Sequence, residues 1–198
     1  MLSRTVDHLI HNVLDAAADY AVAEQELTAA YNTDRTPAAW EAAARRAKRR
    51  AAELAIAIDG LTDRCSGELG ASKTNIRNAV SALCLWPGSG APRLGSHDRV
   101  RGVANAYKHE NLSDPNLPIA SEADVLVVGL GYGLDGYGVG KFGGVEVLVR
   151  EHGGTMYKFL GDAPIAIAAW FKFLATQGAG LPPGPYTVCG LQVAADYQ

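Results

Sequence analysis

The sequence predicts a mainly α-helical protein: a four- to five-helix bundle with a β-hairpin or meander inserted at about residues 123–160. Before residue 118, long segments repeat apolar side chains every three or four positions, as amphipathic helices do. After residue 121 the pattern changes to short valine-rich runs bounded by glycine, which are typical of strands. The chain has 198 residues, 48% of them hydrophobic, which is enough for one core. We therefore expect a single domain over residues 1–198, with the bundle in 1–118 and 161–177 and the β insertion in 119–160.

Two long helices are expected first, over residues 5–31 and 37–61. The first contains no Gly or Pro and is rich in strong helix formers. The second begins with Thr36 as a cap and Pro37 at the first helical position. Its centre carries five cations in six residues, 45–50, which predicts either a solvated face or a contact with nucleic acid or an acidic partner.

Two shorter helices are expected over residues 72–86 and 97–109. Ser72 and Ser96 are suitable N-cap residues for them. The segment 87–92, rich in Gly and Pro, separates the two helices.

The β insertion contains three expected strands, at residues 124–128, 145–150 and 156–160. A last amphipathic helix is expected over 163–176, with Asp162 as its cap. The Gly- and Pro-rich tail that follows is expected to be extended.

The helix expected at residues 97–109 carries an unusual polar face. If successive residues are placed 100° apart, six polar side chains share an arc of about 120°: His97, Asp98, Arg101, Asn105, Lys108 and His109. Ordinary solvated faces are dominated by Glu and Lys, so a face this rich in His, Arg and Asn is a candidate site.

The run Arg101-Gly-Val-Ala-Asn-Ala-Tyr-Lys-His109 within this helix resembles the signature helix of the HEPN superfamily. That superfamily consists of helical bundles often found in bacterial defence and toxin systems, many of them metal-independent ribonucleases. The resemblance implies a homodimer in which an arginine and a histidine meet across the interface. The arginine stabilises a phosphate of RNA, and the histidine helps the ribose 2′-hydroxyl attack it.

Carried over to this chain, the resemblance makes His109 the general base or acid and Arg101 the phosphate clamp. Asn105 would orient them, and His97 or Lys108 would support them, with Asp98 and Lys108 close to the substrate. Seven residues separate Arg101 from His109, against four to six in the family. On a helix this spacing still leaves the two side chains about 80° apart.

A glycine-rich loop at residues 129–144 joins the first two expected strands. It contains two formal matches to G-x-G-x-x-G, but a strand follows where a dinucleotide site needs a helix, so we expect no dinucleotide site. Three side chains in it could contact a substrate: Tyr132, Tyr137 and Lys141. The loop is either a long hairpin connection or an arm that stacks on a nucleobase, closes over a ligand or reaches a second subunit.

No cofactor and no metal are expected. His8 and His11 form an i, i+3 pair, but neither an H-E-x-x-H nor a Glu-x-x-His motif occurs. The three cysteines, Cys65, Cys84 and Cys189, lie far apart, which favours buried free thiols.

The chain carries a net charge of -3, so it is not basic overall. Its first residues are charged where a signal peptide would be apolar, and no run reaches the ~20 apolar residues of a spanning helix. We therefore expect a cytoplasmic protein of bacterial type with no membrane partner.

Two other functions stay open: a non-catalytic protein-interaction module, and a small-molecule enzyme with its pocket between the 97–109 helix and the glycine-rich hairpin.

Overall fold

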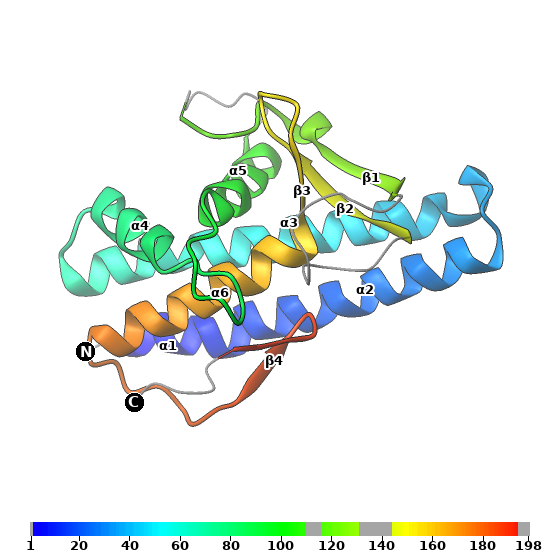
Figure 1. The fold of residues 1–198 in the computed structure, drawn as a ribbon. Helices are drawn as coiled ribbons and strands as arrows, with labels where there is room; N and C mark the ends of the chain where they lie inside the picture. Colours follow the sequence, from blue (N-terminus) through cyan, green and yellow to red (C-terminus); the bar gives the residue numbers. More distant parts are fainter. Residues whose placement is uncertain (1, 110–115, 131–143, 194–198) are drawn as a thin grey trace.

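The computed structural model describes residues 2–109, 116–130 and 144–193, and this part of the chain is mainly helical with two small antiparallel sheets (Figure 1). The mainly α-helical class and the β segment between the fourth expected helix and the last are confirmed.

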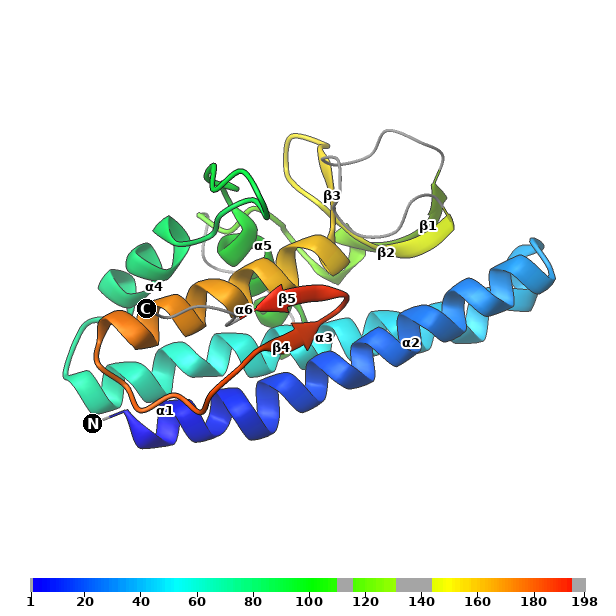
Figure 2. The same cartoon turned by 60° about the horizontal axis from the view of Figure 1, so that its bottom comes forward.

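The first expected helix is present and contains one π-helical turn. It consists of α1 (Ser3–His8), the π turn η1 (Leu9–Val13) and α2 (Leu14–Thr33). After a short turn, α3 (Pro37–Leu69) returns beside α2, and the two form the long base of the molecule (Figures 1 and 2). Pro37 begins α3 as predicted, but the helix continues eight residues past Leu61 because Thr62 and Cys65 extend its buried face.

Helix α4 (Lys73–Ala82) is shorter than predicted. The Ser72 hydroxyl accepts a hydrogen bond from the Asn75 amide and caps the helix as expected. The helix stops before residue 86 because Leu85 forms a β-bridge with Pro92.

Helix α5 (Ser96–Lys108) covers most of the predicted 97–109 segment. Its N-cap residue is Gly95, with φ +78°, and not Ser96 as predicted. A Cβ at Gly95 would lie 2.6 Å from Nη1 of Arg99, so both the backbone angle and the space require glycine there.

The three expected strands form an antiparallel meander in the order β1-β2-β3. They are β1 (Val125–Leu130), β2 (Gly144–Arg150) and β3 (Met156–Lys158), with Val127 opposite Val147 and Val149 opposite Tyr157. Strand β2 packs against α2, α3 and α6, and its side chains from residue 145 to 149 are all buried.

Helix α6 (Phe159–Thr176) follows β3 directly and begins four residues earlier than predicted. Asp162 is therefore part of its first turn and is not its cap, because the buried Phe159 already lies on the helix. The tail forms a second hairpin, β4 (Tyr186–Val188) and β5 (Leu191–Val193), which packs against α2 and α6 (Figure 2).

Helix α6 supplies the largest core side chains, and Trp170, Phe171 and Leu174 are fully buried. The Phe171 ring stacks on Tyr186 of β4 at a centroid distance of 5.3 Å. Among the described residues, Phe159–Thr176 is the one helix long and apolar enough to cross a membrane, and 72% of it is buried inside the protein.

Substitution of Leu54 in α3 tests how much this core contributes to the stability of the protein. Its side chain is fully buried, so we expect Leu54→Ala to lower the free energy of unfolding by about 2–5 kcal/mol. Leu94→Ala is the matched control, because Leu94 is 82% exposed and its loss should change stability by less than about 0.5 kcal/mol. Urea denaturation measures both, and equal effects would contradict this assignment of the core.

Candidate functional site

The polar face of α5 packs against α3 and α4. Lys108 Nζ donates a hydrogen bond to Asp59 Oδ2 of α3 at 2.9 Å, and Arg77 of α4 places Nη2 3.7 Å from Asp59 Oδ1. We call this group the polar seam, and it comprises Asp59, Arg77, Ser81, His97, Asp98, Arg101 and Lys108. Three helices thus contribute to one polar surface that the sequence had placed on α5 alone.

His97 lies inside the protein at the inner end of the seam. Its side chain is 2% exposed, its Nδ1 is 3.4 Å from the Ser81 hydroxyl, and its ring lies 6.4 Å from that of Trp170. Burial lowers the pKa of His97 to about 4, and the nearby Asp98 and Asp59 carboxylates only partly oppose this. His97 is therefore neutral at physiological pH and enclosed by α4 and α6.

The other predicted residues of α5 are more accessible. Asn105 Nδ2 donates to the backbone carbonyl of Arg101 at 3.0 Å, within the same helix, and both residues are half-buried. His109 lies one residue beyond the helix, with extended backbone (φ −132°, ψ 131°), and is exposed. The helical arc that predicted His109 beside Arg101 therefore ends at Lys108. Tyr132, Tyr137 and Lys141 lie outside the described residues.

Arg77 is the seam residue that sequence analysis missed. Its side chain is 23% exposed, yet its Nε is buried without a hydrogen-bond partner, as is Oδ1 of Asp59. Arg77 and Lys73 are the two cations of the short amphipathic helix α4, and neither carries a local signal of a site, so only the packing of α4 on α3 reveals the role of Arg77. With Arg101 and Lys108 it gives the seam three cations against the two carboxylates of Asp59 and Asp98.

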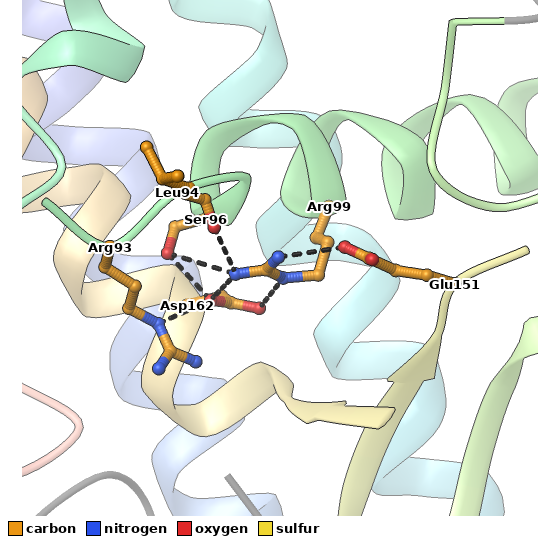
Figure 3. Close-up of polar contacts among 6 residues, drawn as sticks. All are labelled: Arg93, Leu94, Ser96, Arg99, Glu151 and Asp162. Carbon is orange, nitrogen blue, oxygen red and sulfur yellow. Dashed lines mark hydrogen bonds and ion pairs between the residues drawn. The ribbon is translucent and has the colours of Figure 1, made fainter. Parts of the chain in front are cut away.

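A second polar cluster lies on the opposite side of α5, around the carboxylate of Asp162 (Figure 3). Asp162 Oδ1 accepts hydrogen bonds from Arg93 Nε at 2.9 Å, Ser96 Oγ at 2.8 Å and Arg99 Nη2 at 2.9 Å. Its Oδ2 accepts from Arg99 Nε at 2.7 Å, and Arg99 Nη1 donates to Glu151 at 2.9 Å. We call these five residues the Asp162 cluster.

The Asp162 cluster is closed to solvent except at Glu151, whose side chain is 27% exposed. The side chains of Arg93, Arg99 and Asp162 are at most 2% exposed, and the Arg99 guanidinium lies 3.7 Å from the centroid of the Tyr157 ring. Burial alone would lower the pKa of Arg99, but the hydrogen bonds and charge of Asp162 outweigh it and raise that pKa. Two guanidinium groups face two carboxylates, so we interpret the cluster as a structural joint between α5 and α6.

The basic run of α3 is paired with acidic side chains. Arg45 bonds to Glu41, Arg46 to Glu26, and both Arg49 and Arg50 to Glu53. These pairs are typical of a solvated face, which was one of the two interpretations of this run.

The three cysteines are free, and burial raises the pKa of Cys65 to about 11 and of Cys84 to about 12. Both thiols stay protonated near neutral pH and are poor nucleophiles.

Within residues 2–109, 116–130 and 144–193, no group of three or more His, Cys, Asp or Glu side chains is placed to hold a metal ion.

Comparison with protein-family models finds no match, and comparisons with curated proteins and with solved structures find none either.

The Asp162 cluster makes a direct prediction for stability. Asp162→Ala removes the carboxylate that two buried guanidinium groups share and leaves Arg99 only its bond to Glu151, so we expect a loss of about 3–5 kcal/mol in the free energy of unfolding. Glu41→Ala removes an exposed i,i+4 ion pair with Arg45 and should cost less than about 0.5 kcal/mol. Thermal and urea unfolding compare the two variants, and a mild effect of Asp162→Ala would show that the cluster is not a joint.

The buried His97 predicts a pH dependence of stability. Because its pKa is lowered from 6.5 to about 4 in the folded protein, the unfolded chain binds more protons between these values. The stabilisation is therefore complete above pH 6.5 and is lost as the pH falls toward 4, by up to about 3 kcal/mol. His97→Asn keeps a polar group near Ser81 but cannot titrate, so its stability should fall less over this range. Burial also lowers the pKa of His8, but that contribution is common to both proteins and cancels in the difference. Parallel stability curves for the two proteins between pH 7 and 4 would contradict the assignment.

Proposed function

We propose that this chain is a dimeric RNA-binding protein that cleaves RNA without a metal. The proposed site lies at the end of the polar seam that is formed by Arg77, Arg101 and Lys108. The fold we propose with it is the helical bundle that the HEPN resemblance implies, with the β-meander as an insertion that is not a core part of that fold. One observation carries the proposal: Arg77 from α4 joins Lys108 of α5 around a single carboxylate, Asp59, beside the half-buried Arg101. The two cations come from α4 and α5 and the carboxylate from α3, so their meeting does not follow from the sequence pattern of α5 alone.

The seam has the chemistry of a phosphate contact. A guanidinium group binds phosphate oxygens through a rigid fork of N–H donors, and the side chain of Arg77 is 23% exposed. Asp59 keeps Arg77 and Lys108 close together by lowering their mutual repulsion. The net positive charge of the seam attracts a polyanion at this place even though the whole chain is slightly acidic.

His109 is the proposed proton-transfer residue. Imidazole is the side chain best able to take up and return a proton near neutral pH, and His109 is exposed immediately after Lys108. His97 is buried and neutral, so we assign it no contact with RNA.

A second copy of the chain completes the proposed site. Because His109 leaves the helix of Arg101 with extended backbone, the two side chains are not held on one face within a single chain. A dimer would bring His109 of one protomer to Arg101 of its partner, which is the arrangement that the resemblance implies.

Cleavage of RNA in the presence of EDTA tests the proposal. We expect the wild type to cleave, and His109→Ala to lose about 100-fold or more of that activity, the usual contribution of general acid–base catalysis. His11→Ala is the matched control because His11 is an exposed histidine, 70% exposed, on the first helix. Equal cleavage by wild type and His109→Ala would refute the catalytic role.

Binding is tested separately with the same RNA. Arg77→Gln should weaken RNA binding. It should also lower the slope of log Kd against log salt concentration by about 1, the contribution of one phosphate contact. Arg49→Gln, an exposed arginine paired with Glu53 on α3, is the control and should leave that slope unchanged. A mixture of Arg101→Ala and His109→Ala proteins should regain activity, since one of the two sites in the mixed dimer is then intact.

A further inference from the structure

The accessible polar side chains of α5 form one stripe along the helix. Three of them are half-buried and the last is exposed, and they follow one another at intervals of three or four positions: Asp98, Arg101, Asn105 and Lys108. This spacing places them within an arc of about 80° on one side of the helix. We call these four residues the α5 stripe, and it is the surface of α5 that another molecule can contact.

Asp98 has no charged partner within the described part of the chain. In residues 2–109, 116–130 and 144–193, no hydrogen bond or ion pair reaches its carboxylate. The next residue, Arg99, points instead toward Asp162 and is paired with it through three hydrogen bonds (Figure 3). The charge of Asp98 is therefore available to a cation of another molecule.

The α5 stripe carries opposite charges at its two ends. Asp98 lies in the first turn of α5 and Lys108 in the last, about 15 Å apart along the helix axis. Lys108 donates to Asp59 at 2.9 Å, but an ammonium group has three N–H donors, so two of them are left for another acceptor. A surface of this kind is complementary in charge to a second copy of itself that runs in the opposite direction.

We infer that a second copy of the chain docks on the α5 stripe with its own α5 antiparallel, about a two-fold axis level with Val103. This inference rests on the proposed function, which requires a dimer, and it names the surface that forms the dimer. Asp98 then meets the partner's Lys108, and the symmetry repeats this ion pair at the other end. Parallel helices would instead set each of these charges against its own copy, which is unfavourable.

The same register brings Arg101 and His109 together across the axis. Arg101 lies opposite the partner's Asn105, and the partner's His109, which directly follows its Lys108, lies beside Asp98 within one turn of Arg101. Asn105 donates through Nδ2 to the Arg101 carbonyl of its own helix at 3.0 Å, which leaves its side-chain oxygen to accept from the partner's Arg101. The arginine and the histidine of the proposed reaction therefore come from different protomers.

Charge reversal at the two ends of the α5 stripe tests this docking by sedimentation velocity. Asp98→Lys sets two lysines against each other at both ends of the dimer, and Lys108→Glu does the same with two carboxylates. We expect each variant alone to dimerise about tenfold or more weakly than the wild type. In an equimolar mixture of the two variants every pair is again of opposite charge, so the mixed dimer should regain the wild-type affinity.

Glu41→Lys is the matched control for charge reversal. Glu41 is an exposed carboxylate near the start of α3, and its reversal should leave dimerisation unchanged. Thermal unfolding of each variant shows that it is folded before its association is compared. Unchanged dimerisation of Asp98→Lys, or a mixture that associates no better than its two components, would overturn the inference.

Disulfide cross-linking tests the register without reversing any charge. Asp98→Cys and Lys108→Cys proteins are oxidised separately and as a mixture, with the wild type, whose Cys65 and Cys84 are buried, as the control. In the antiparallel arrangement equal positions lie about 15 Å apart, well beyond the reach of a disulfide, so only the mixture should give covalent dimers. Covalent dimers from either variant alone, or none from the mixture, would contradict the antiparallel register.

Neither experiment uses RNA, so the docking surface and the ribonuclease activity are tested apart. A wild type that dimerises through the α5 stripe but cleaves no RNA would refute the proposed function and support the docking surface. A wild type that stays monomeric at about 100 μM would overturn the docking surface, and cleavage of RNA by that monomer would place the reaction within one chain.

Discussion

The buried carboxylate of Asp162 is the interaction on which the rest of the structure depends. Removing a carboxylate and two guanidinium groups from water costs several kcal/mol for each ion, and only complete pairing offsets that cost. Arg93, Ser96 and Arg99 together supply four hydrogen bonds to its two oxygens. Those bonds fix the start of α5 against the first turn of α6, which enters directly from β3.

This joint also sets the rotation of α5 about its axis. Residues two apart on a helix point about 160° away from each other, so turning Arg99 toward Asp162 turns His97 and Arg101 to the other side. That side faces α3 and α4, where Asp59 and Arg77 complete the polar seam. The candidate site on one face of α5 is therefore a geometric consequence of the ion cluster on the other face.

Helix α3 contacts polar side chains on two of its sides, Lys108 of α5 on one and His8 of α1 on the other. Asp59 contacts Lys108 on one side, whereas the Ala57 carbonyl and Gly60 contact His8 on the other. Fully buried Leu54, Ile58 and Leu61 hold the helix between them. Because both regions are built on one helix of 33 residues, each has a rigid support although its other residues come from different elements.

The sequence by itself determined the helical class, the start of α3 at Pro37 and the β-meander, because apolar spacing, proline and β-branched runs act on the backbone locally. It also located the polar face of α5, but it treated Ser96 and Asp162 as helix caps, which their local context favours. Only the tertiary structure decided that Ser96 donates to Asp162 and that Asp162 binds Arg93, 69 residues away. It also decided that His97 is buried and that Arg77 joins the seam. The physical reason is that the solvation and pairing of a charge depend on which distant segments pack around it, and no local sequence pattern records that packing.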